Sequence, residues 1–266
     1  MTKLTRRGMF SCALLLGTLT VTSAARAQDA YPAPNAARPS TLSALTLRVD
    51  AQLSIGRAVF CIYAGPLQLC EGDTFARLSA GAGFGITDDL EVGALYLLPI
   101  QFAPDADFLN PRLYGRYRFL DGDVELSVQL GLTIPFQGVF AFDVGVPAWV
   151  HINADLVLRS GLTYAAVASN PVIHTLAVPL ELVGQITPEI FVGGGIDPTL
   201  VFGSGSAQLV LPLGVHGGYT FASGGAPVAD VQLGFSFPEF LHTGDGGATA
   251  LSVWQILLTG RIYAFL

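Results

Sequence analysis

The sequence is poor in charged residues and has almost no lysine. Charged residues make up 12% of the 266-residue chain and hydrophobic residues 51%, whereas soluble domains carry about 25% charged residues. The mean hydropathy is +0.54, and the single lysine is Lys3. A membrane is therefore a candidate environment for this chain.

The N-terminus has the layout of a cleaved export signal. Basic residues come first, an apolar run over residues 9–21 follows, and Ala25-Arg26-Ala27 provides a small-x-small cleavage site. This run is too short to span a bilayer comfortably, so residues 1–27 are predicted to be a Sec-type signal peptide, with a twin-arginine signal as the alternative. Residues 28–42, rich in Pro, Ala and Asn, are predicted to form a flexible periplasmic segment.

Acidic residues outnumber basic ones in the remaining chain. Four of the 13 basic residues belong to the signal, so nine remain against 20 acidic residues, a net charge of about −11. Such a chain is a poor partner for nucleic acid. The sequence also predicts no cofactor.

Cysteine is scarce after the signal. Only Cys61 and Cys70 remain, and in an exported protein two such cysteines are predicted to form a disulfide, with two free thiols as the alternative. No histidine lies near them in the sequence, so a metal site is not predicted.

Long apolar runs without glycine or proline are also missing. Residues 198–229 contain no charge, but glycine and proline interrupt them throughout, which argues against a membrane helix. The pattern instead alternates: over residues 46–55, every even position is polar and every odd position apolar. This period of two predicts a strand with one polar and one apolar face.

Tight-turn signals recur about every 32 to 36 residues and divide the chain into hairpins. They lie at Thr87-Asp88-Asp89, Asp121-Gly122, Asn153-Ala154, Thr187-Pro188 and Ser223-Gly224-Gly225. Longer connections alternate with them, the first over residues 57–74. The predicted strands are 45–56, 75–86, 90–102, 110–119, 123–136, 142–151, 155–167, 173–185, 189–202, 207–220, 227–238 and 250–265. The sequence thus predicts an all-β protein: a transmembrane, antiparallel up-and-down barrel of about 12 strands over residues 43–266, with both termini in the periplasm.

Charges within each predicted strand share one face. Strand 123–136 shows this best, since Glu125 has the opposite parity to a row of large apolar residues from Val124 to Ile134. A basic residue facing lipid near the bilayer midplane costs about 2–4 kcal/mol. The charged face is therefore predicted to line a lumen. A soluble sandwich would show the same parity, and the export signal, low charge and strand length argue against it.

The hairpin GAGFGITDDLEVGALYLL at residues 81–98 resembles a hairpin of Gram-negative outer-membrane β-barrels. Among these are transporter-like proteins of the group named after the MetA pathway of phenol degradation. The C-terminus, with Gly260, Tyr263 and Phe265, is similar to the signal that the barrel-assembly machinery reads, except that Leu266 follows the last aromatic residue. The resemblance implies an outer-membrane location in a Gram-negative bacterium, with lipid and the assembly machinery as partners. Placing Tyr263 and Phe265 on lipid, as the resemblance implies, would put Arg261 there as well unless a bulge intervenes, because the three residues share parity.

Charged residues on the inner parity are the candidate functional residues. We expect Arg118 to pair with Glu125 across one tight turn, and His151 to face Asp155 across another. Arginines of strand 110–119 are expected to face carboxylates across the bore. The predicted lumen-facing set is Arg48, Asp50, Arg112, Tyr114, Arg116, Arg118, Glu125, Asp143, His151, Asp155, Arg159 and Glu181.

Two main functions fit this pattern. In the first, the barrel is a narrow channel or transporter-like pore for small solutes, whose charges orient anionic or dipolar solutes. In the second, the charges pair and fill the lumen of a structural or interaction barrel. A barrel lipase or deacylase is a third possibility, but no convincing Ser–His spacing is present, so no catalytic residue is predicted.

Overall fold

The computed structural model describes residues 31–64, 67–98, 111–135, 140–203, 207–244, 247–250 and 253–266. Within these ranges the only helix is a 3-10 turn, η1 (Asn35–Ala37), and everything else regular is β-strand. No helix in the described ranges has the length and hydropathy needed to cross a membrane. The predicted signal peptide, residues 1–27, lies outside the described residues.

All strand segments of the described chain belong to one antiparallel sheet. They are β1 (Thr46–Ala64), β2 (Leu67–Thr87), β3 (Leu90–Leu98), β4 (Arg112–Leu120), β5 (Val124–Thr133), β6 (Ala141–Asn153), β7 (Leu156–Val167), β8 (Ile173–Ala177), β9 (Leu180–Gln185), β10 (Ile190–Ile196), β11 (Thr199–Phe202), β12 (Gln208–Ser223), β13 (Ala226–Gly244), β14 (Gly247–Ala250) and β15 (Val253–Phe265).

In three places, two consecutive segments are parts of one strand that is interrupted. Both β8 and β9 pair with β7, both β10 and β11 pair with β12, and both β14 and β15 pair with β13. Pro179 separates the first pair and Pro198 the second, because proline lacks the N–H that a sheet ladder requires. The 15 segments therefore make 12 strands.

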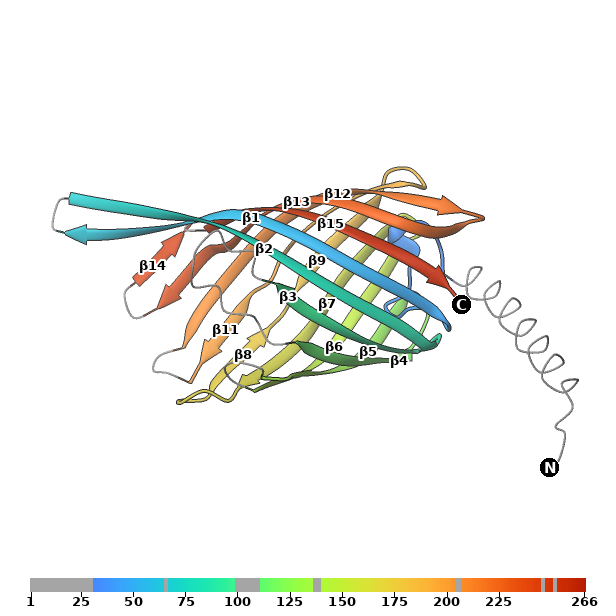
Figure 1. The fold of residues 1–266 in the computed structure, drawn as a ribbon, viewed down its shortest axis with the longest axis horizontal. Coiled ribbons are helices and arrows are strands. Elements are labelled where there is room, and N and C mark those ends of the chain that lie inside the picture. Colours follow the sequence, from blue (N-terminus) through green and yellow to red (C-terminus); the bar gives the residue numbers. More distant parts are fainter. Residues whose placement is uncertain are drawn as a thin grey trace, which may run out of the picture.

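The sheet closes on itself because β15 pairs with β1 on one side and β13 on the other. This confirms the predicted closed, antiparallel barrel of 12 strands (Figure 1). The five predicted tight turns all connect strands, and they lie at the same end of the barrel as the C-terminus. We call this end the turn end and the opposite one the loop end. Gly122, Gly224 and Gly225 adopt positive φ in these turns, a conformation that side chains disfavour.

The barrel surface alternates as the sequence predicts. On β5, Val124 and Leu130 are 42% and 61% exposed, whereas Glu125 and Ser127 on the other face are 4% and 0% exposed. The exposed large side chains of the neighbouring strands are also apolar, among them Leu113 and Val146. The wall thus has an apolar outer face and a polar inner face. This arrangement is typical of a barrel whose outer face contacts lipid hydrocarbon.

The first hairpin is longer than predicted. The sequence predicts a loop over residues 57–74, but β1 and β2 stay in register up to Ala64 opposite Leu67. The hairpin extends well beyond the rest of the barrel at the loop end (Figure 1). The run Val59-Phe60-Cys61-Ile62-Tyr63 consists of residues that favour strands, which accounts for the continued pairing.

The segment before β1 also differs from its prediction. Residues 28–42 are expected to be flexible, yet the described part of this segment, residues 31–42, lies at the turn end within the barrel, where η1 is drawn in blue in Figure 1. Tyr31, Ala36 and Leu42 are 4%, 0% and 0% exposed. Backbone hydrogen bonds join Ala33 to Gly225 and Leu45 to Gly85 at the barrel rim. We call residues 31–45 the N-terminal plug.

Candidate functional site: the lumen and its N-terminal plug

The N-terminal plug is held mainly by charged and polar side chains of the wall. Arg38 is its main anchor: the guanidinium donates to both carboxylate oxygens of Asp230 on β13, at 2.6 and 3.0 Å. It also donates to the hydroxyl groups of Thr220 and Tyr263, and its Cζ lies 5.2 Å from the centre of the Tyr263 ring. Charge-assisted, two-point pairs of this kind are among the strongest hydrogen bonds in proteins.

Other strands hold the backbone of the plug. The Ser40 amide donates to Glu125 of β5 at 2.7 Å, and the Leu42 amide donates to Glu91 of β3 at 3.1 Å. In return, Arg116 of β4 donates to the Ser40 carbonyl at 2.6 Å. These contacts satisfy plug groups that would otherwise be buried without partners. The plug is therefore bonded to strands on several sides of the lumen.

Of the two expected pairs across tight turns, Arg118–Glu125 is present and His151–Asp155 is not. Arg118 lies 3.6 Å from Glu125, but a bulge sets it opposite Ser127 in the register, and its closest carboxylate is Asp89 at 2.9 Å. His151 contacts Glu125 at 2.9 Å rather than Asp155. Its other ring nitrogen lies 3.1 Å from the Ala36 carbonyl of the plug.

Asp155 differs from the rest of the predicted lumen set because it lies in the tight turn between β6 and β7. Its side chain is exposed. Its backbone amide donates a hydrogen bond to the side-chain oxygen of Asn153, within the turn. The bulge at the end of β6 sets His151 opposite Val157. This shift removes the expected cross-strand pair between His151 and Asp155.

The remaining predicted carboxylates pair along the wall rather than across the bore. Arg112 forms a two-point ion pair with Asp143 at 2.6 and 2.8 Å, and Arg159 lies 3.4 Å from Glu181. Asp50 contacts Arg48 at 2.9 Å and Arg261 at 3.3 Å. Tyr114 donates its hydroxyl to Glu91, at 2.7 Å.

Arg116 is the exception among the basic residues of β4. It donates to the Gln129 side chain at 2.6 and 3.0 Å and to the plug backbone, and no carboxylate of the described chain lies within ion-pair distance. It also lines three neighbouring cavities of the lumen. Its charge therefore faces the space that a solute would occupy.

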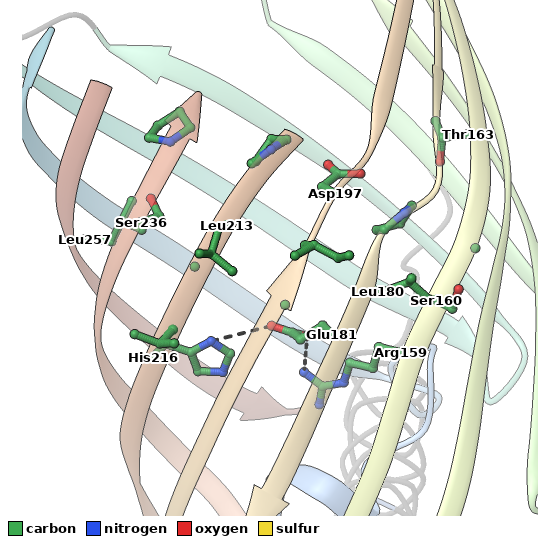
Figure 2. A pocket seen from close by; sticks show the side chains of 18 of the residues that line it. Arg159, Ser160, Thr163, Leu180, Glu181, Asp197, Leu213, His216, Ser236 and Leu257 are labelled. Atoms are coloured by element: carbon green, nitrogen blue, oxygen red, sulfur yellow. Dashed lines mark hydrogen bonds and ion pairs between the residues drawn. The ribbon is translucent and has the colours of Figure 1, made fainter. Parts of the chain in front are cut away.

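Two of the cavities in the described lumen share wall residues. The larger, of about 670 Å³, is lined by residues of strands from β4 to β15, among them Trp149. Figure 2 shows Arg159, Glu181, His216 and Leu257 around it. The smaller, of about 370 Å³, adjoins the plug at Arg38 and Ser40. Both include Arg116 and Trp149 in their walls. The space between the plug and the loop end is thus of small-solute size.

Sequence reasoning missed Asp197 as a site residue. Figure 2 shows its carboxylate directed into the larger cavity, next to the break between β10 and β11. The alternation along the sequence places Asp197 on the inner face. That no basic side chain pairs with it depends on which strands become its neighbours, and these are distant in the chain.

The C-terminal aromatic residues face inward instead of toward lipid. Tyr263 is 6% exposed and donates its hydroxyl to Asp230 at 2.7 Å, and Phe265 packs against the cluster of Tyr31, Leu42 and Tyr263. Ile262 and Leu266 lie on the outer face, at 62% and 51% exposure. The parity conflict with Arg261 is resolved because Arg261 and Tyr263 share the inner face. Recognition of Gly260, Tyr263 and Phe265 by the assembly machinery stays a prediction.

Cys61 and Cys70 occupy opposing positions of β1 and β2 in the register. Their side chains lie outside the described part of the structure, so the disulfide stays a prediction. The register gives it the cross-strand placement that it requires.

The chain matches no protein-family model and no curated protein sequence. Solved structures do resemble it in fold. An outer-membrane channel from Pseudomonas putida F1 superposes with a TM-score of 0.62 at 12% identity, covering 85% of this chain and 99% of that one. A TodX deletion mutant, described as a monoaromatic hydrocarbon channel, gives 0.51 at 10% identity, covering 90% and 94%. This chain therefore has the fold of an outer-membrane β-barrel.

Proposed function

We propose that the chain is an outer-membrane channel for small solutes, with a charged lumen that its N-terminal plug restricts at the turn end. The observation that carries the proposal is the cavity of about 670 Å³ inside a closed barrel. A barrel that served only as a scaffold would gain stability from a filled interior. The lumen instead keeps a space with polar and apolar walls.

The placement in the outer membrane is supported by the surface and the sequence. The strands of a closed barrel satisfy one another's backbone groups within hydrocarbon, and the apolar outer face suits contact with lipid. We propose that residues 1–27 direct export by the Sec route and that the barrel-assembly machinery inserts the chain in a Gram-negative outer membrane. In such barrels the tight turns face the periplasm, and we propose that the plug and both termini lie there.

The names of the two similar structures support the class of function. Both are described as channels, one of them for monoaromatic hydrocarbons. The histidines favour a channel over an enzyme, because in the described ranges none is hydrogen-bonded to a serine, threonine or cysteine side chain that could serve as a nucleophile. His151 contacts Glu125, His174 contacts the Tyr164 hydroxyl, His216 lies 3.6 Å from Glu181 and His242 contacts Gln208.

A structural or interaction barrel is the second candidate. The observation in its favour is the plug, whose Arg38 and Asp230 side chains are 3% and 2% exposed. A permanently seated plug would leave a barrel that conducts nothing.

Planar-bilayer recording separates the two candidates. The pure, folded mature protein is inserted, and its current is compared with that of a variant lacking residues 31–42. The channel proposal expects current in at least the shortened variant, and a larger one than in the complete protein. Silence in both proteins would favour the structural barrel.

A further inference from the structure

Asp197 presents an unpaired carboxylate to the larger cavity. It lies between β10 and β11 (Figure 2) and lines the cavity together with Trp149, Pro179 and Pro212. Its Oδ1 atom is buried and has no hydrogen-bond partner among the described residues. A buried carboxylate oxygen in that state costs free energy until a donor reaches it.

The other inner carboxylates show what is unusual about Asp197. Six of them have a basic side chain within ion-pair distance: Asp50, Glu91, Glu125, Asp143, Glu181 and Asp230. In the described ranges Asp197 has none. The wall thus pairs these six carboxylates with basic side chains and leaves Asp197, which lines the larger cavity, without one.

The local backbone explains why no wall donor satisfies Asp197. Its own amide is used in a hydrogen bond to the Pro212 carbonyl, at 3.2 Å. The next residue is Pro198, which has no N–H, and the adjoining wall positions Pro179 and Pro212 also lack one. The nearby Thr199 hydroxyl donates to the Asp197 backbone carbonyl, at 3.1 Å.

We propose that Asp197 binds the ammonium group of a small organic amine inside the larger cavity. An ammonium group supplies both the missing positive charge and N–H donors for the unpaired oxygen. Trp149, Leu257 and the proline rings offer an apolar wall for the rest of the solute. Organic amines would then be a class of solute for the proposed channel. Their transport rests on the channel proposal, whereas their binding at Asp197 does not.

The basic residues of the cavity are compatible with such a ligand because they are already engaged. Arg159 lies 3.4 Å from Glu181 and donates to the Asn35 side chain at 2.6 Å. Arg116 donates to Gln129 and to the Ser40 carbonyl. Arg159 is thus paired with a carboxylate, whereas Arg116 is held at the wall by hydrogen bonds and keeps an unpaired charge in the same cavity. Asp197 is the acidic group left for a solute.

Binding of n-hexylammonium to the folded protein in detergent tests the inference. Trp149 lines the cavity and the second tryptophan is Trp254, so a Trp254→Phe background reports on Trp149 fluorescence. We expect a saturable change, and a dissociation constant at least about tenfold weaker in Asp197→Asn, since a charge-assisted hydrogen bond is lost. Glu189→Gln is the matched control, because Glu189 lies in a tight turn at the turn end and does not line the cavity. No saturable change, or equal binding in Asp197→Asn, would overturn the site.

A second ligand keeps the test valid if Asp197→Asn does not fold. Hexyltrimethylammonium has the same charge and chain but no N–H, so we expect it to bind the unmodified Asp197 site at least about tenfold more weakly. Equal binding of the two cations would overturn the role of the unpaired oxygen. A protein that binds hexylammonium through Asp197 but carries no current would refute the channel alone, whereas current without such binding would refute this inference alone.

Discussion

The Arg38 guanidinium of the N-terminal plug and the Asp230 carboxylate of β13 form a buried two-point ion pair, with N···O distances of 2.6 and 3.0 Å. Both side chains are almost fully buried, and 192 residues of sequence separate them. This pair joins the plug to the barrel wall. Its loss should therefore affect the stability of the protein and the position of the plug together.

Replacing Arg38 with Gln leaves the Asp230 charge buried without its partner. We expect the free energy of unfolding in detergent to fall by about 3–5 kcal/mol, as for other broken buried ion pairs. Chemical denaturation measures this change. The double variant Arg38→Gln/Asp230→Asn removes both charges and should recover part of the loss; an equal or larger loss in the double variant would show that the pair is not the source of the stability.

A glycine of β2 provides a steric test of plug seating. A Cβ at Gly85 would meet the backbone carbonyl oxygens of Ser43 and Leu42, the latter at 2.8 Å. Gly85→Ala should therefore lower the free energy of unfolding by about 1–3 kcal/mol, the usual cost of overpacking. Gly115→Ala is the control, since nothing lies within 4 Å of its added Cβ. Similar losses in both variants would contradict tight packing at Gly85.

The unpaired charge of Arg116 should influence ion selectivity. Arg116→Gln removes a positive charge that faces the lumen, so we expect the reversal potential in a salt gradient to shift toward greater cation preference. Arg118→Gln is the comparison, because Arg118 is paired with Asp89 at the turn end. If the two variants shift equally, or neither shifts, Arg116 does not set selectivity.

The cysteine pair of the first hairpin makes a chemical prediction. Cys61 and Cys70 face each other in the β1–β2 register, and an exported protein meets oxidising conditions. Denatured mature protein without reductant should therefore contain no thiol that reacts with a maleimide, and two after reduction, as mass spectrometry would show. Two reactive thiols before reduction would disprove the disulfide.

The strands were predictable because short-range rules determine them. Alternation along residues 46–55 and the turn residues Asp121-Gly122 each act within one hairpin, and both appear in the structure. The inner parity of Arg112 and Asp143 follows from the same rule. Their pairing does not, because it depends on which strands become neighbours and on bulges such as the one after Arg118.

The plug was not predictable from composition. Asn35-Ala36-Ala37-Arg38-Pro39-Ser40 has few apolar side chains and reads as a flexible linker. Its order comes from partners that are remote in the sequence, as in the contact of Ser40 with Glu125. The inward position of Tyr263 has the same origin, since its hydroxyl completes the Arg38 and Asp230 cluster.

The most direct test of the account is the single-channel current of the mature protein with and without residues 31–42, at equal salt and voltage. The account predicts that removing this part of the plug raises the conductance severalfold, because it frees the turn end of a lumen that already contains a cavity of about 670 Å³. An intact, membrane-inserted barrel that carries no current in either form would contradict it.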